Sequence, residues 1–200
     1  MISKNSQYLL RGTPSLLLPL GAGFVMASSA DIRAALGMGI AVILTMLISS
    51  IIISAIRKLI PDCARVPAFL LIITGTVSLI DMLMQAHTPD IVNMLGVHLA
   101  ALAVSAVPYR DAEEVAGVSG EGKTLKISLL TGLFFTAILV VCALIREILG
   151  NATLAGKPIE LLANYKVSAL AGAFGGYVVL AIVLAAIRKI GSMIKAKEEK

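Results

Sequence analysis

The feature that most constrains this chain is a series of six apolar runs, each separated from the next by a short charged or turn-forming segment. A membrane-spanning helix needs about 20 mostly apolar residues, because every backbone N–H and C=O group must be paired inside the segment. The pattern therefore predicts an all-α integral membrane protein with six transmembrane helices. The expected spans are 16–30, 35–56, 66–84, 91–107, 127–145 and 167–187.

Composition agrees with this class of protein. The mean hydropathy is +0.94, and charged residues make up only 14% of the 200 residues. A soluble domain of this length needs more charge to cover its surface, so the bilayer is the expected solvent. The six runs and their loops fill the chain and leave no room for a soluble domain. We therefore expect one polytopic membrane domain over residues 1–200, with a charged cytoplasmic tail at 191–200.

The net charge of +5 would suggest a nucleic-acid partner in a soluble protein. Here the Lys and Arg residues lie at the ends of the apolar runs, where they set orientation instead. With the N-terminus in the cytoplasm, thirteen of the 17 Lys and Arg residues fall on the cytoplasmic side. This asymmetry predicts that both termini are cytoplasmic, and we expect no binding of nucleic acid.

The two halves of the chain show a weak internal similarity. Span 2 ends in the segment 55–60 (Ala-Ile-Arg-Lys-Leu-Ile), and span 5 ends in 144–149 (Leu-Ile-Arg-Glu-Ile-Leu). Three spans per unit would make two inverted repeats, at about 12–88 and 89–190, as in many transporters. The alternative is chance, because the same Ile-Arg-Lys pattern recurs at 187–189.

Spans 1 and 4 are short or broken, and they hold equivalent places in the two halves. Gly21 and Gly23 interrupt span 1, and span 4 ends at Ser105-Ala-Val-Pro108. Such interruptions at equivalent positions indicate a site near the middle of the membrane. The alternative is that the glycines simply allow helices to pack closely.

Two ionisable residues within the spans are candidates for an ion pathway, because charge at that depth is costly. Asp81 is expected near the outer end of span 3, and His98 within span 4. The alternative is structural: Asp81 reaches the membrane interface, and a neutral His98 is hydrogen-bonded by a neighbouring helix.

Catalytic motifs are not expected in this chain. Residues 117–124 fit the P-loop pattern G-x-x-x-x-G-K-[ST], but no α/β domain surrounds them, so we expect no nucleotide there. Cys63 and Cys142 are far apart, which suggests neither a disulfide framework nor a zinc site. No nucleophile–base pair or metal-ligand spacing is present. The chain is at most a non-catalytic subunit.

Several segments in order resemble one family, the E-type (RnfE/NqrD) membrane subunits of the Rnf/Nqr electron-transport complexes. The most specific is the motif after span 5, which includes Arg146, Glu147, Gly150 and Asn151. Within it, Arg146 and Glu147 are candidates for an interfacial ion pair. The other matching segments are 20–23 with 36–39, 57–73 and 111–116.

This resemblance implies a subunit of an ion-pumping redox complex in a prokaryotic cytoplasmic membrane, beside a homologous A-type (RnfA/NqrE-like) subunit and other redox subunits. Such pairs are thought to hold a [2Fe–2S] cluster, with one cysteine from span 1 and one from span 4 of the E-type chain. Here those positions fall on Gly23 and Ala106, whose side chains cannot bind iron. We therefore expect no cofactor in this chain alone, and a role in assembly or in the ion pathway.

Two alternatives remain open from the sequence. Six spans in about this length also fit the substrate-binding membrane subunit of a vitamin-type transporter, which would have an ATP-hydrolysing partner. An isolated remnant without activity would have neither redox partners nor an ATPase.

Overall fold

The computed structural model describes residues 31–113, 121–151, 153–154, 157–158 and 172–198. Helices make up almost all of this part of the chain. The exceptions are short connections and two antiparallel strands, β1 (Thr153–Leu154) and β2 (Lys157–Pro158), which pair with each other. The prediction of an all-α membrane protein is confirmed.

The helices follow the predicted apolar runs closely. In chain order they are α2 (Ile32–Ile56), the 3-10 turn η1 (Asp62–Ala64), α3 (Arg65–His87), α4 (Pro89–Leu95), α5 (Val97–Ala101), the 3-10 turn η2 (Leu102–Val104), α6 (Ala106–Asp111), α7 (Glu121–Arg146), the π-helical turn η4 (Glu147–Asn151) and α9 (Ala173–Glu198).

Three helical segments of the described part are long and apolar enough to cross a membrane: Ile32–Ile56, Asp62–His87 and Thr124–Gly150. They correspond to the predicted spans 2, 3 and 5. Large apolar side chains lie exposed on them, for example Ile40, Leu71 and Leu133. In a bilayer such surfaces face lipid tails or a partner helix, so their exposure fits a membrane protein.

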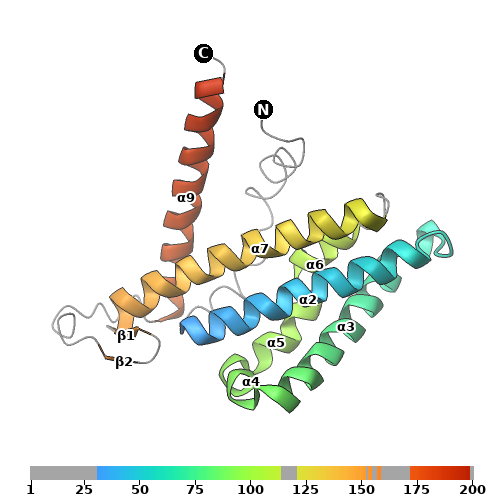
Figure 1. The fold of residues 1–200 in the computed structure, drawn as a ribbon, viewed down its shortest axis with the longest axis horizontal. Helices are drawn as coiled ribbons and strands as arrows, with labels where there is room; N and C mark the ends of the chain where they lie inside the picture. Colours follow the sequence, from blue (N-terminus) through green and yellow to red (C-terminus); the bar gives the residue numbers. More distant parts are fainter. Residues whose placement is uncertain (1–30, 114–120, 152, 155–156, 159–171, 199–200) are drawn as a thin grey trace.

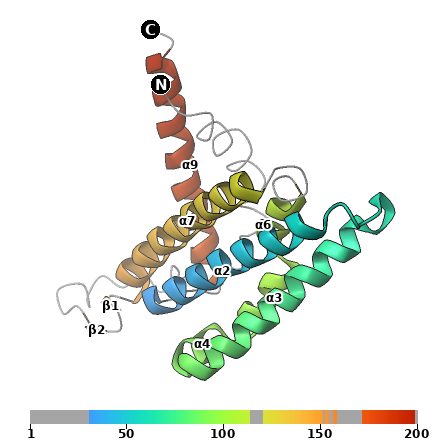
Figure 2. The same cartoon turned by 45° about the vertical axis from the view of Figure 1, so that its right-hand side comes forward.

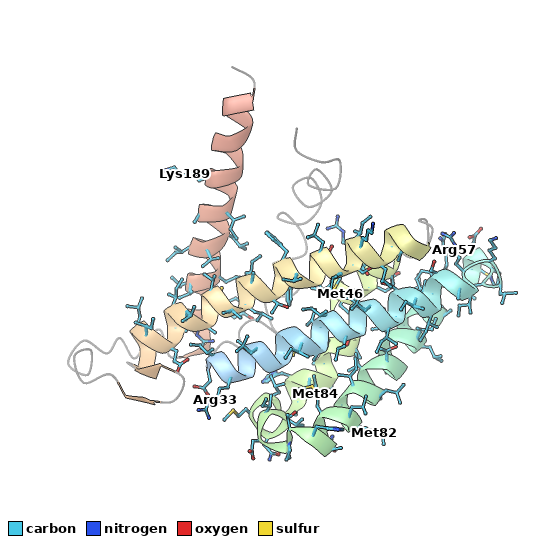
Figure 3. All side chains as sticks on the ribbon, in the orientation of Figure 1. Arg33, Met46, Arg57, Met82, Met84 and Lys189 are labelled. Atoms are coloured by element: carbon cyan, nitrogen blue, oxygen red, sulfur yellow. The ribbon has the colours of Figure 1, made fainter. Side chains whose placement is uncertain are left out.

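The centre of the fold is an antiparallel pair formed by α2 and α7, which lie side by side (Figure 1). Helix α3 packs against α2, and α9 packs against α7. The core between these helices contains fully buried Met38, Met46, Phe69, Ile73 and Leu139. Arg33 near the start of α2 and Arg57 just after its end mark the two ends of the pair (Figure 3).

Small residues bring α2 and α7 close together. A Cβ atom on Gly39 would overlap the Cγ2 methyl group of Thr136, and one on Gly132 would lie 3.1 Å from Cγ1 of Ile43. The Thr136 hydroxyl donates a 2.8 Å hydrogen bond to the Gly132 carbonyl oxygen of its own helix, and the Gly39 carbonyl oxygen lies 3.3 Å from the same hydroxyl. Close backbone approach through small residues is how helices associate in lipid, where no hydrophobic effect drives them together.

The C-terminal helix differs from its prediction. The described part of span 6 is the apolar stretch Gly175–Ile187, and residues 159–171 lie outside the described part. Helix α9 continues through Glu198, so most of the expected charged tail at 191–200 is helical, and its location in the cytoplasm stays a prediction. In two views α9 crosses α7 steeply instead of lying alongside it (Figures 1 and 2).

The first span cannot be compared with the structure, because residues 1–30, including Gly21 and Gly23, lie outside the described part. The two inverted repeats at 12–88 and 89–190 therefore stay a prediction. The pairing of α3 with α2, and of α9 with α7, is the pairing that such a repeat would give.

Candidate functional site

The predicted span 4 is a broken helix. Taken together, α4 and the helical segment Val97–Asp111 are long and apolar enough to cross a membrane. They are bent by 72° relative to each other at the break between Leu95 and Val97. Gly96 lies at this break with φ 51° and ψ −133°, a backbone conformation that L-amino acids with a side chain rarely adopt. The prediction that span 4 is short or broken is confirmed. The sharp bend lies at Gly96, and the helix is interrupted again at the extended residue Ser105, where the span was expected to end.

The broken helix is anchored by one apolar face. Leu95, Leu99, Leu102 and Val107 are almost fully buried, and its segments contact α2 and α3. The Gly37 position on α2 accommodates it, because a Cβ there would overlap the Cγ2 methyl group of Ile91 in α4. The opposite face exposes Val97 and Val104. The bend directs the end of α6 back between α2 and α7.

Asp111 ends α6 and lies in a buried polar cluster with two serines. Its Oδ2 atom accepts a hydrogen bond from the Ser50 hydroxyl of α2 at 2.7 Å, and one from the Ser128 hydroxyl of α7 at 2.6 Å. The two serine hydroxyl oxygens are 2.9 Å apart. Both serines are 0% exposed and Asp111 is 5% exposed. We call Ser50, Asp111 and Ser128 the Asp111 triangle.

The triangle lies inside the membrane-spanning segments. Ser50 is six residues before the end of α2, which is about 9 Å along a helix with a rise of about 1.5 Å per residue. Ser128 lies four residues inside the apolar segment Thr124–Gly150. The carboxyl group therefore connects three helices about one to two turns from the ends of α2 and α7.

Two other hydroxyls on the buried face of α2 make only local hydrogen bonds. Thr45 donates to the Ala41 carbonyl oxygen at 2.7 Å, and Ser49 to that of Thr45 at 2.6 Å. This i to i−4 pattern satisfies a hydroxyl in an apolar helix without any partner helix. Ser50 differs because its hydroxyl is directed to a carboxylate and a serine on other helices.

At the opposite end of the α2–α7 pair, the motif after span 5 forms a second buried polar contact. The Glu147 side chain is 0% exposed, and its Oε2 atom accepts a 3.0 Å hydrogen bond from the backbone N–H of Ile32. The carboxylate thus occupies the N-terminus of α2, where the N–H groups have no partner within the helix and the helix dipole favours negative charge.

Arg146 contacts a different element. Its guanidinium group donates a 3.3 Å hydrogen bond to the Gly172 carbonyl oxygen, just before α9. Arg146 and Glu147 therefore connect the end of α7 to α9 and to α2. Their ion pair with each other stays a prediction. Gly150 and Asn151 lie in the π-helical turn η4 that follows.

The predicted ion-pathway residues are not gathered into one site. Asp81 is partly exposed on α3 and accepts a 3.0 Å hydrogen bond from Gln85, one turn further along. His98 is exposed on α5. No hydrogen bond or ion pair joins them among the residues that the structure describes. Their role in ion movement stays a prediction.

The described residue at a position that the resemblance assigns to a cluster ligand, Ala106, offers no atom that could bind iron. Ala106 is the first residue of α6 and has no ligand atom, and the preceding Ser105 offers a hydroxyl and not a thiolate. Cys63 is exposed in η1, and Cys142 is buried in α7. In the described part of the chain, no group of three or more His, Cys, Asp or Glu residues could hold a metal ion.

The P-loop-like segment is only partly described. Gly122, Lys123 and Thr124 belong to the first turn of α7, and residues 114–120 lie outside the described part. The helix continues directly into the apolar segment that starts at Thr124. The absence of nucleotide there stays an expectation.

These features define a class: a multi-pass α-helical membrane protein with a broken span and a buried acidic group between its helices. The family can also be stated. The chain belongs to the Rnf-Nqr family, described as "Rnf-Nqr subunit, membrane protein", which matches residues 2–186.

Curated relatives agree with this family. The chain is 34% identical over 148 residues to the E-type subunit of the Na(+)-translocating ferredoxin:NAD(+) oxidoreductase complex of Acetobacterium woodii, covering 74% of this chain and 76% of the relative. It is 32% identical over 160 residues to the E-type subunit of the ion-translocating oxidoreductase complex of Shewanella frigidimarina, covering 80% and 69%. The resemblance to E-type subunits is confirmed, and the comparisons give no support to the transporter alternative.

Sequence reasoning missed the Asp111 triangle. The family resemblance places Asp111 in an acidic segment after span 4, and the two serines occupy ordinary positions in spans 2 and 5. The available signal is weak but present: Ser49-Ser50 interrupts a long apolar run, and an acidic residue follows a proline-containing span end. The tertiary packing of α2, α6 and α7 brings these residues together.

Proposed function

We propose that this chain is an E-type membrane subunit of an Rnf/Nqr-like ion-translocating electron-transport complex, that it holds no [2Fe–2S] cluster by its own residues, and that it acts in assembly or in the ion pathway. One observation carries the proposal: the family match extends over residues 2–186, yet the chain has only two cysteines, and the positions that the resemblance assigns to the cluster thiolates fall on Gly23 and Ala106. The fold is kept while the cluster ligands are not.

The chemistry of the available side chains supports the second part of the proposal. A [2Fe–2S] cluster in such a pair requires cysteine thiolates. The two cysteines of the chain lie on different elements, Cys63 in the exposed turn η1 and Cys142 in the buried part of α7. Neither cysteine therefore lies in the broken span, which carries Ala106.

The expected partners are a homologous A-type membrane subunit and the redox subunits of the complex, within the lipid bilayer. The relatives are named as subunits of oxidoreductase complexes. Apolar side chains such as Leu71, Val97 and Val104 are 74–82% exposed in the isolated chain. Such a surface is suited to lipid or to partner helices.

The proposed location is the cytoplasmic membrane of a prokaryote, with both termini in the cytoplasm. The distribution of charge on the folded chain supports this orientation. Cations gather where α2 and α6 end and where α3 and α7 begin, while Arg33 and Arg146 lie at the other end of the α2–α7 pair. The cationic group consists of Arg57, Lys58, Arg65, Arg110 and Lys126. The cytoplasmic side of membrane proteins carries the excess of Lys and Arg.

Co-purification from the native host tests the proposal. The tagged full chain is extracted in a mild detergent, and the bound proteins are identified by mass spectrometry against an untagged control. The proposal predicts an A-type sibling together with flavin- or iron–sulfur-containing subunits. Recovery of an ATP-hydrolysing module without redox subunits would contradict it and would favour a carrier.

A further inference from the structure

The Asp111 triangle contains three oxygen–oxygen contacts of hydrogen-bond length. They are 2.7 Å from Ser50 Oγ to Asp111 Oδ2, 2.6 Å from Ser128 Oγ to the same oxygen, and 2.9 Å between the two serine oxygens. All three lie in the range of O–H···O hydrogen bonds. Three full hydrogen bonds in this triangle need three hydrogens, one between each pair of oxygen atoms.

An ionised Asp111 cannot supply these hydrogens. Each serine carries one hydroxyl hydrogen, and a carboxylate carries none. If both serines donate to Oδ2, the contact between Ser50 and Ser128 can only share one of these two hydrogens, at an angle that weakens the hydrogen bond. The distances also make the two donors converge on Oδ2 at an acute angle, which two independent donors would avoid. A further donor to Asp111 from elsewhere would not change this count.

One added hydrogen completes the set. If Oδ2 carries a proton, it donates to Ser50, Ser50 donates to Ser128, and Ser128 donates back to Oδ2. Each of the three contacts then has one hydrogen, and the group is neutral. We propose that Asp111 is a proton-binding site within the membrane domain, held by Ser50 and Ser128. The ligand is a proton and not a metal ion, since all three separations are those of hydrogen bonds.

The setting supports a neutral acid. The three residues are at least nine-tenths buried, and a charge is costly at such a position in a membrane. Ser54 lies one turn beyond Ser50 on the same face of α2, is 6% exposed, and has no hydrogen-bond partner among the described residues. Its hydroxyl provides the next polar position between the triangle and the end of α2.

Charged neighbours of the triangle oppose protonation of Asp111. Cations dominate this end of the packed helices and favour an ionised carboxylate. Retention of the proton therefore depends on burial and on the closed ring of hydrogen bonds. The titratable side chains that the structure describes at this end are Arg57 and Lys58 after α2, Asp62, Cys63 and Arg65 at the start of α3, Tyr109, Arg110 and Glu113 around the end of α6, and Lys126 on α7.

This inference goes beyond the proposed function and can fail independently of it. Infrared difference spectroscopy of the full chain reconstituted in lipid vesicles measures it directly, through the C=O stretch of a protonated carboxylic acid at neutral pH. Labelling with carboxyl-¹³C aspartate assigns the band to aspartate. We expect the band to be present, to shift in D₂O because the proton exchanges, and to be lost in Asp111→Asn.

Two further variants separate this result from a loss of folding. Asp81→Asn removes a partly exposed carboxyl group from α3 and should leave the band unchanged. Ser128→Ala removes one donor to the acid and should keep the band but shift its frequency. Absence of the band in the folded wild-type protein, its persistence in Asp111→Asn, or its failure to respond to D₂O would each overturn the proposal.

Discussion

Individual polar and small residues determine how this apolar chain packs. Most apolar side chains in the spans could be exchanged for other apolar side chains without changing how the helices interact with the bilayer. A few residues instead make contacts that depend on their particular side chain. Thr136 packs closely against Gly39 of the facing helix, Glu147 caps the start of α2, and Ser50 connects α2 to Asp111. Such interhelical contacts specify the arrangement because lipid itself gives helices no preferred partner.

A substitution at Gly39 tests the close contact between α2 and α7. In Gly39→Ala the new methyl group would overlap the Thr136 side chain, whose β-branched rotamer is restricted. Overpacking of this kind costs about 1–3 kcal/mol. We therefore expect a lower free energy of unfolding in detergent micelles, measured by denaturant titration.

Gly75 provides the matched control for that substitution. It also lies in a membrane helix, α3, but a Cβ there would meet nothing within 4 Å. Alanine is favoured over glycine in a helix interior by about 1 kcal/mol. Gly75→Ala should be neutral or stabilising, and an equal loss of stability in both variants would contradict the close contact at Gly39.

At the scale of elements, the long helices could be predicted from the sequence and the broken one could not. The apolar runs at 35–56, 66–84 and 127–145 match α2, α3 and α7 to within a few residues at most ends. Their length and hydropathy are local properties of the chain. The 72° bend and the placement of Asp111 against Ser50 and Ser128 depend instead on the tertiary path of the backbone. A residue pattern does not encode that path directly.

A substitution at Gly96 tests whether the break in the fourth span depends on the backbone conformation of glycine. A Cβ there would meet no atom within 4 Å, so any effect of Gly96→Ala must come from its φ of 51°. A side chain in such a strained conformation costs about 1–3 kcal/mol. We expect reduced thermal stability of the detergent-solubilised protein, with Gly75→Ala as the unstrained comparison. An unchanged midpoint in Gly96→Ala would show that the break tolerates another backbone conformation.

On the scale of the whole molecule, one orientation in the membrane accounts for the charge distribution. Cys63 gives a direct test because it is exposed in η1, between α2 and α3, whereas Cys142 is buried in α7. A membrane-impermeant thiol reagent should label Cys63 in inside-out vesicles and not in right-side-out vesicles. Cys63→Ser should abolish the labelling, and labelling from the outer side would reverse the proposed orientation.

The central claim is that this member of the Rnf-Nqr family keeps the fold of an E-type subunit without holding a cluster by its own residues. The most direct measurement is the content of iron and acid-labile sulfide per chain, in the full chain purified alone and in its Cys63→Ser/Cys142→Ser variant. The account predicts no stoichiometric iron or sulfide in either protein. Stoichiometric iron with sulfide in the wild-type chain, lost when the cysteines are replaced, would contradict it.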